Sequence, residues 1–222
     1  MPTSAWRCTL DTKFYKTFAR FLTETADSLR NIHRWTHYRQ IPEHERESVE
    51  THSLTTVWLA GAMLAIERKL GAHALNDARI LLAAALHDVG EGVIGDVRYA
   101  LKIDPRLKDH IQAIESEHVG KMFQGFPQVV RDAFAAAYAV ESEKSLDGRF
   151  FKGIERIGYI LYAVPQVKIG RTEFIQVFGH QHQSLLDMSK EFESVRLFYE
   201  PYREYVEEKL ADYETRRHCD DG

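Results

Sequence analysis

The sequence predicts an all-α fold, and two observations carry that prediction. Apolar residues recur at three- and four-residue steps along most of the chain, and no stretch alternates convincingly between apolar and polar residues as a half-buried strand would. In addition, the run Ile80–Leu86 is apolar at every position. A helix that is apolar on all sides belongs in the centre of a domain, so this run predicts a central, buried helix.

The helices before the central one follow from the same spacing. The first is expected over residues 11–32, and its apolar positions are Phe14, Phe18, Phe21, Leu22, Leu29 and Ile32. Residues 36–49 are expected to form an exposed connection, since Pro42 and the charged run 43–47 are typical of a solvated loop. A deeply buried second helix is expected over residues 53–70.

Further helices follow the central one. Asn76 or Asp77 can cap the central helix itself. After a glycine-rich stretch, the pattern predicts a helix over residues 104–123, which opens with Asp-Pro, and another over residues 127–138. In residues 144–148 apolar side chains do not recur at a helical spacing, so this segment is expected to be a loop.

The last third of the chain is again helical in pattern. Residues 150–164 are expected to form a helix that stops at Pro165. Two final helices are expected over residues 172–192 and 195–218, the second bent or broken at Pro201. Their many aromatic residues suit either packing on the core, which is the simpler interpretation, or a homodimer face.

Composition limits the class of protein. A chain of 222 residues with 44% hydrophobic residues can bury one good core, and no repeat or linker divides it, so a single domain over residues 1–222 is expected. The net charge of −4 without a basic cluster argues against a nucleic-acid polymer as partner. Cys8 and Cys219 lie far apart and are expected to be free thiols in a reducing compartment. Because no signal segment or membrane-length apolar run is present, the protein is expected to be cytoplasmic and not membrane-bound.

The candidate site follows the central helix directly. His87, Asp88, Glu91 and Asp96 lie within ten residues, beside three glycines. A lone buried histidine is more often a satisfied core residue than a ligand. Four ionisable groups at the end of a buried helix favour a site instead, because buried charges are costly unless they are paired or bind a metal.

A metal ion would need ligands from elsewhere in the chain. His52 is the natural candidate because it stands where a polar loop enters a buried helix, and Glu155 is the one acid on the helix predicted over residues 150–164. Imidazole nitrogen and carboxylate oxygen suit Zn, Co, Mn or Fe(II). An ion pair of Glu155 with Lys152 or Arg156 is an equally good interpretation at this point.

In the order and spacing of these residues, the chain resembles the HD-domain metal-dependent phosphohydrolases. More narrowly, it resembles their bacterial 5'-deoxynucleotidase branch with its phage relatives. The resemblance covers about residues 31–163. Its matching pieces are Arg34-Trp35, Glu47-Ser-Val-Glu-Thr-His52-Ser53, His87-Asp88-Val-Gly-Glu91, Gly95-Asp96, Leu101-Lys102 and Phe151-Lys152-Gly-Ile-Glu155. The C-terminal extension, residues 165–218, lies outside it.

The resemblance implies a single divalent metal ion, Co, Mn, Zn, Mg or Fe, held by His52, His87 and Asp88. It also places Glu155 where the family usually has a last ligand, an Asp. The chain departs from the family there and at Thr51, where the branch commonly has Glu, and its loop before His52 is longer. The longer glutamate side chain can still ligate, either directly or through water.

The remaining site residues have roles that phosphate chemistry suggests. Glu91 lies one turn beyond His87 and is expected to be the general acid/base, with Asp96 orienting water or sharing the proton. Lys102 and Lys152 are candidates to bind phosphate oxygens, the alternative being ordinary exposed lysines.

Arg34 and Trp35 have two interpretations. An Arg-Trp pair at a helix end is more often packing with a capping charge. The resemblance implies instead that Arg34 approaches phosphate or sugar and that Trp35 packs on the deoxyribose, where a bulky ring rejects a 2'-hydroxyl. The expected activity is therefore phosphate release from deoxynucleoside 5'-monophosphates.

Other functions stay open at this stage. They are a triphosphate phosphohydrolase of the same fold, an inactive HD scaffold, a cyclic-nucleotide phosphodiesterase and a stringent-response hydrolase. The phosphodiesterases usually carry Lys at the position of Glu91 and would need further ligands such as His110 and His118, which are interpreted here as surface residues. His180 and His182 lie two apart, face apart on a helix and are expected to be solvated.

Overall fold

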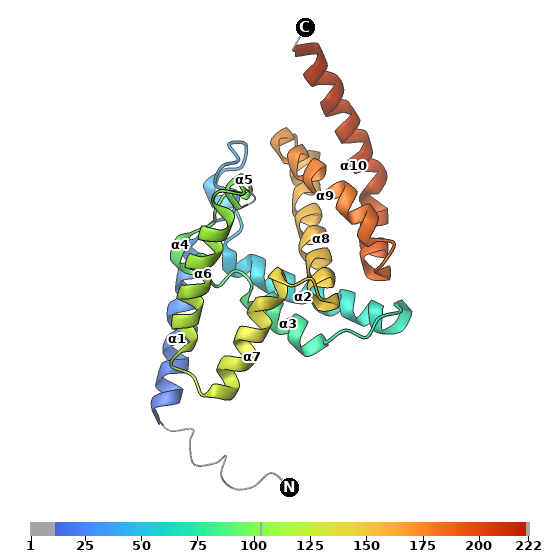
Figure 1. Cartoon of the computed structure of the whole chain (residues 1–222). Coiled ribbons are helices and arrows are strands. Elements are labelled where there is room, and N and C mark those ends of the chain that lie inside the picture. The colour runs from blue at the N-terminus through green and yellow to red at the C-terminus, as the bar shows by residue number, and fades with distance from the viewer. Residues whose placement is uncertain (1–11, 103, 221–222) are drawn as a thin grey trace.

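The structure is a computed structural model that describes residues 12–102 and 104–220, the side chains of residues 12, 13, 99 and 216–220 excepted. The all-α prediction is confirmed: no strand occurs in this part of the chain, only an isolated antiparallel bridge between His33 and Ser48. Figure 1 shows the order of the helices, which are α1 (Thr12–Asn31), α2 (Val49–Leu70), α3 (Asp77–Leu86), α4 (Glu91–Ile94), α5 (Tyr99–Lys102), α6 (Lys108–Phe123), α7 (Gln128–Tyr138), α8 (Leu146–Lys168), α9 (Ile175–Met188) and α10 (Glu193–Asp220), with 3-10 turns η2 (Glu43–Glu45), η3 (Ala139–Ser142) and η4 (Thr172–Phe174). Cys8 and the side chain of Cys219 lie outside the described residues.

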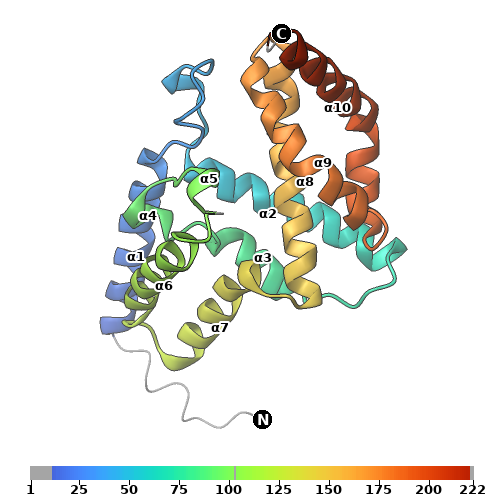
Figure 2. The same ribbon diagram turned by 45° about the horizontal axis from the view of Figure 1, so that its top comes forward.

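The helices form two packed groups with α3 between them. In both ribbon views α1, α4 and α6 stand on one side, α8, α9 and α10 stand on the other, and α2 and α3 run between the two groups (Figures 1 and 2). The larger core takes Ala83 and Ala84 of α3, whereas the smaller core takes Leu86 and Val89. The predicted His-Asp pair therefore lies at the seam where the two cores meet.

Three helix starts differ from the predictions, and side-chain capping explains two of them. Helix α2 begins at Val49 because the Ser48 hydroxyl accepts a hydrogen bond from the Thr51 N–H at 3.1 Å, so His52 stands in its first turn. Ser145 caps α8 by accepting from Gly148 N–H, so the expected loop over residues 144–148 is mostly helix. The helix expected from residue 104 begins at Lys108. Before it, Asp104 accepts from the Arg106 N–H at 2.9 Å and closes a turn.

The two prolines do not end their helices. Helix α8 continues past Pro165 to Lys168, and α10 runs without a break through Pro201. Pro165 lies in the last turn of α8, where its missing N–H costs a single hydrogen bond and the helix end is restored by Ile169 N–H donating to Pro165 O at 3.2 Å. The predicted stop at Pro165 and the predicted break at Pro201 were wrong, and the alternative of a bend at Pro201 stays a prediction.

The connection between α1 and α2 is more buried than expected. Tyr38 is 7% exposed and Ile41 is 1% exposed, and both belong to the larger core. The prediction of an exposed loop over residues 36–49 is therefore wrong for its apolar members. Their burial ties the loop to α8 and η4, on the side where Trp35 also packs.

The C-terminal helices pack on the same core as α2, α3 and α8. Phe174, Phe178, Phe192, Tyr199 and Val206 are almost fully buried in the larger core. His182 is also part of this packing, since its Nδ1 lies 2.5 Å from the Tyr199 hydroxyl, so the prediction that it is solvated was wrong.

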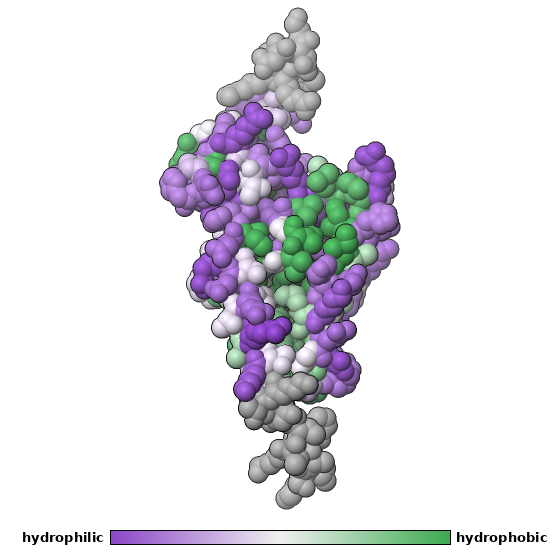
Figure 3. Space-filling model, turned by 90° about the vertical axis from the view of Figure 1, so that its left-hand side faces the viewer, coloured by the Kyte–Doolittle hydropathy of each residue, from purple (hydrophilic) through white to green (hydrophobic). Residues whose placement is uncertain are grey.

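The surface leaves apolar side chains exposed on the side of α1, α4 and α6. Figure 3 shows them gathered in the middle of that face, between hydrophilic borders. Leu22, Val93 and Ile114 are 51%, 49% and 47% exposed. The homodimer remains a prediction. None of the described helices combines the length and the apolar character that a membrane crossing requires.

Candidate metal centre

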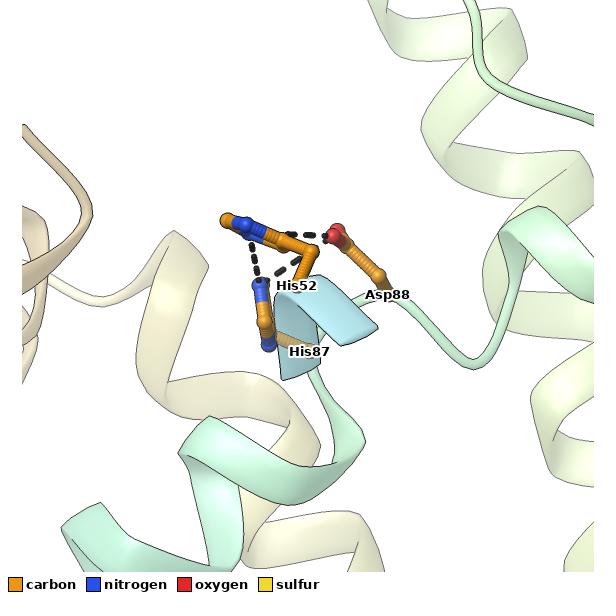
Figure 4. Close-up of side chains that lie close together, drawn as sticks. All are labelled: His52, His87 and Asp88. Atoms are coloured by element: carbon orange, nitrogen blue, oxygen red, sulfur yellow. Dashed lines mark hydrogen bonds and ion pairs between the residues drawn. The ribbon is translucent and has the colours of Figure 1, made fainter. Parts of the chain in front are cut away.

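Two histidines from different helices face each other at the seam between the cores. His87 is the residue that ends α3, and its Nδ1 lies 3.1 Å from the Ala84 carbonyl, to which a neutral ring donates its proton. In that neutral form Nε2 would carry the lone pair. This atom lies 3.3 Å from Nε2 of His52 in α2 (Figure 4). Both side chains are buried.

Asp88 completes a three-residue group. Its Oδ2 lies 3.2 Å from His87 Nε2 and 3.6 Å from His52 Nε2, and the ligand atoms of all three residues fall within 4.8 Å of one another. An ion with bonds of ~2.0–2.1 Å to its ligands holds neighbouring ligand atoms about 2.9–3.4 Å apart. The group thus has close to the spacing that a divalent cation requires.

The electrostatics of the group also fit a cation. Burial lowers the pKa of His52 well below its usual value, and Arg34 lowers it further. Burial acts in the same direction on His87, but Asp88, and then Glu155 and Glu141, outweigh it and raise the pKa of His87 to about 9. Without metal, His87 therefore keeps a proton where the two ring nitrogens meet. A metal ion would take that place, because ligating histidines are neutral.

Glu155 lies near the group but is not a member of it. Burial, the neighbouring Glu141 and Asp88 raise the pKa of this carboxyl to about 8, although His87 and Arg34 oppose them. The described residues include no ion pair of Glu155 with Lys152 or Arg156, and Arg156 donates to Gln181 instead. The ion-pair alternative is therefore wrong, and ligation by Glu155 stays a prediction.

Glu91 and Lys102 form a second feature of the site. The Lys102 ammonium donates to Glu91 Oε1 at 2.6 Å, so the alternative of a simply solvated lysine is wrong. Glu91 is 2% exposed, and its Oε2 is buried without a hydrogen-bond partner. Burial and then Asp88 raise the pKa of Glu91 to about 7, against the opposing charge of Lys102.

Arg34 and Trp35 lie beside the group of His52, His87 and Asp88. Arg34 is 6% exposed and donates through Nη1 to Asp88 Oδ2 at 2.8 Å. The Trp35 ring stacks on Tyr162 with centroids 4.9 Å apart and an interplanar angle of 3°. Both residues are thus packed and hydrogen-bonded, yet they also face the pocket described next.

A pocket of about 660 Å³ opens over the group. Seven of the ten predicted site residues line it: Arg34, Trp35, Asp88, Asp96, Lys102, Lys152 and Glu155. The other three, His52, His87 and Glu91, are buried behind this lining and reach it through Asp88 and Lys102. The structure therefore brings all ten predicted residues to one place.

Other residues of the site had no predicted role. Glu47 was expected in an exposed run, but its side chain is 12% exposed and accepts from the Trp35 indole N–H at 2.9 Å. Its place in the Glu47-to-Ser53 motif was the available signal. Glu141 and Tyr159 also line the pocket. Glu141 opens a polar run that resembles a solvated loop, and Tyr159 stands among apolar residues of α8, so no pattern marks either of them.

Known proteins resemble this chain in sequence and in fold. The family model described as 5'-deoxynucleotidase YfbR-like matches residues 20–206. A 5'-deoxynucleotidase of Vibrio parahaemolyticus is 28% identical over 144 residues, which are 64% of this chain and 73% of that protein. One of Yersinia pestis is 27% identical over 162 residues, which are 71% and 79% of the two chains.

Two solved structures share the fold. An HD-domain phosphohydrolase from Listeria innocua has a TM-score of 0.68 at 18% identity, over 87% of this chain and 90% of its own. A predicted metal-dependent phosphohydrolase from Magnetospirillum magnetotacticum has a TM-score of 0.63 at 15% identity, over 89% and 97%. The family match extends well beyond residue 165, so the C-terminal helices belong to the shared architecture.

Proposed function

We propose that this chain, which belongs to the YfbR-like 5'-deoxynucleotidase family, releases phosphate from deoxynucleoside 5'-monophosphates. It is a phosphohydrolase of the metal-dependent HD type. The observation that carries the proposal is the buried group of His52, His87 and Asp88 behind a pocket whose lining includes Arg34 and Lys152. A pocket of about 660 Å³ suits one nucleotide, since small-molecule sites span ~300–1,000 Å³.

Residues of this chain would hold the metal and the phosphate. His52, His87 and Asp88 would bind a single divalent ion, which supplies Lewis acidity and an activated water when bound. Lys152 faces the pocket on α8 and would bind phosphate oxygens. Arg34, held on Asp88, places a second positive charge at the metal end of the pocket.

Glu91 would provide the proton for the leaving group. Its pKa of about 7 keeps a substantial protonated fraction at neutral pH, and Lys102 occupies Oε1. The proton would therefore sit on Oε2, the oxygen without a partner in the described structure, and pass to the 5'-oxygen of the sugar as the P–O bond breaks. Asp96, on the pocket wall, would orient water.

Trp35 would contact the sugar and distinguish deoxyribose from ribose. The ring is 7% exposed, lines the pocket and is held by aromatic neighbours on several sides. A fixed ring against C2' leaves no room for a hydroxyl, and a hydroxyl buried there without a partner would be costly.

A triphosphate phosphohydrolase is the second candidate. Lys108 and Arg156 line the same pocket in addition to Lys102 and Lys152. These extra cations could meet the β- and γ-phosphates of a longer substrate.

One panel separates the candidates. Metal-free protein is loaded with Co, Mn, Zn or Mg and given deoxy- and ribonucleoside mono-, di- and triphosphates, while phosphate, pyrophosphate and triphosphate are resolved. We expect phosphate from deoxynucleoside monophosphates as the main product. Triphosphate as the main product would favour the second candidate, and no product with any metal would favour the inactive scaffold. His87→Ala is the matched control, because it removes one ligand atom.

A further inference from the structure

One carboxylate contacts three residues of the site at once. Glu47 Oε1 accepts from the Trp35 indole N–H at 2.9 Å, and the same oxygen lies 3.5 Å from Arg34 Nε and 3.8 Å from His52 Nδ1. We propose that Glu47 is the positioning residue that fixes the ring of Trp35 and so sets the sugar selectivity of the pocket. The inference rests on the proposed function, in which Trp35 reads the sugar.

The backbone of Trp35 shows why an anchor is needed. Its φ is +64°, the left-handed region, and it is the only described residue other than glycine with a positive φ. Bulky residues rarely adopt this conformation, and they keep it only where surrounding contacts hold it. Such outliers gather at functional sites.

Stacking alone does not fix the ring. Tyr162, Tyr38 and Phe174 pack against it, with centroids 4.9, 5.4 and 5.3 Å away. Aromatic contacts tolerate sliding of one ring over another. The hydrogen bond to Glu47 is directional, and a charged acceptor makes it stronger than a neutral one would. It therefore selects one orientation of the indole within the stack.

Glu47 is itself held in place. Its carbonyl accepts from the Arg34 N–H at 2.9 Å, and the Val49 N–H donates to the Ile32 carbonyl at 2.9 Å. These two bonds join the segment before Trp35 to the segment that enters α2. The carboxylate is thus a fixed point between the residue that would read the sugar and His52 of the metal group.

The first test observes Trp35 without any activity measurement. The chain has three tryptophans, so ¹⁵N-labelled protein gives at most three indole N–H signals, and Trp35→Phe identifies the one from Trp35. In Glu47→Ala that signal should shift and exchange faster with solvent. Glu47→Gln keeps an acceptor oxygen, so the Trp35 indole signal should return to its wild-type position. Glu43 is an exposed residue of the same loop, and Glu43→Ala should leave the signal unchanged.

The second test measures selectivity at saturating metal. The ratio of kcat/KM for a deoxy- over a ribonucleoside monophosphate should fall roughly 10-fold in Glu47→Ala and much less in Glu47→Gln. In a Trp35→Phe background, which lacks the donor, Glu47→Ala should change the ratio less than about 2-fold. If Glu47→Ala does not fold, Trp35→Phe alone should still lower the ratio.

The outcomes separate the two proposals. An unchanged indole signal in Glu47→Ala, or an equal loss of selectivity with and without the indole N–H, would overturn the role of Glu47. A wild-type protein that hydrolyses no nucleotide would overturn the proposed function instead, while the indole signal would still report on Glu47.

Discussion

At the scale of single residues, burial and neighbouring charges move the pKa values of two nearby carboxyl groups, Asp88 and Glu91, in opposite directions. Burial opposes ionisation of Asp88, but His87, and then Arg34 and His52, outweigh it and lower its pKa well below the usual value. Burial raises the pKa of Glu91 to about 7. Two acids with separated pKa values suit one ligand and one proton carrier. The motif and the resemblance predicted Asp88 as a ligand and Glu91 as the general acid/base. The contacts that separate the two pKa values could not be predicted from the sequence, because they depend on how the chain folds.

Glu91→Gln should therefore lower kcat and leave the metal in place. The loss of a general acid/base costs ~10²–10⁴-fold in rate, whereas Glu91 is outside the three-residue metal group. Steady-state kinetics with metal analysis of the same sample checks this, and Glu117→Gln, exposed on α6, is the control. A folded, metal-loaded and fully active Glu91→Gln protein would contradict the role.

Glu155 should make the metal-free protein less stable as the pH rises. Its pKa is raised in the folded state to about 8, so between about pH 4.5 and 8 the unfolded chain ionises this carboxyl while the folded chain does not. The free energy of unfolding of wild type should fall across that range relative to Glu155→Gln. Urea unfolding at pH 5 and pH 8 measures the difference, and a pH-independent difference would show that Glu155 is not held neutral by the fold.

At the scale of elements, packing and capping determine where the helices begin and end, which periodicity alone does not predict. Periodicity identified most helices, because each has an apolar side that faces a core. It misplaced the start of α2 and the end of α8, because Ser48 caps the first and the last turn of the second tolerates Pro165. The buried role of Glu47 was missed for a similar reason: a run of charges looks solvated unless its partners in space are known.

Two glycine substitutions should have opposite effects on stability. A Cβ at Gly153 of α8 would lie 2.8 Å from Val195 Cγ2 of α10, and Val195 is fully buried and stiff. Overpacking of this kind costs ~1–3 kcal/mol, so Gly153→Ala should destabilise. A Cβ at Gly120 of α6 meets nothing within 4 Å, so Gly120→Ala should gain roughly 0.5–1 kcal/mol from helix propensity. Chemical unfolding of both variants is the measurement, and equal effects would refute the close packing of α8 on α10.

At the scale of the whole molecule, the site is a junction between two cores. His52 and His87 come from α2 and α3, which run between the two groups of helices, and the pocket walls come from both sides. The sequence predicted the ligand candidates from the local motif and the resemblance. It could not predict that α4 and α5 would join Glu91 to Lys102, because that contact depends on the path of the chain after Gly90.

Metal binding at such a junction should stabilise the entire domain. A ligand that binds only the folded state raises the free energy of unfolding by about 2.7 kcal/mol when its concentration is 100 times its Kd. Thermal unfolding should therefore shift upward with Co or Mn and return after chelation. His52→Ala should remove the shift, since it takes away one of the three buried ligand candidates. A metal-induced shift of wild-type size in this variant would place the ion elsewhere.

The most direct test of the central claim is metal-dependent phosphate release, followed in one titration. Chelated protein is titrated with Co or Mn while phosphate release from a deoxynucleoside 5'-monophosphate and bound metal are measured together. We expect activity to rise with bound metal, to saturate at one ion per chain, and to be lost together with the ion in His87→Ala. Full activity without metal, or an unchanged metal content in His87→Ala, would contradict it.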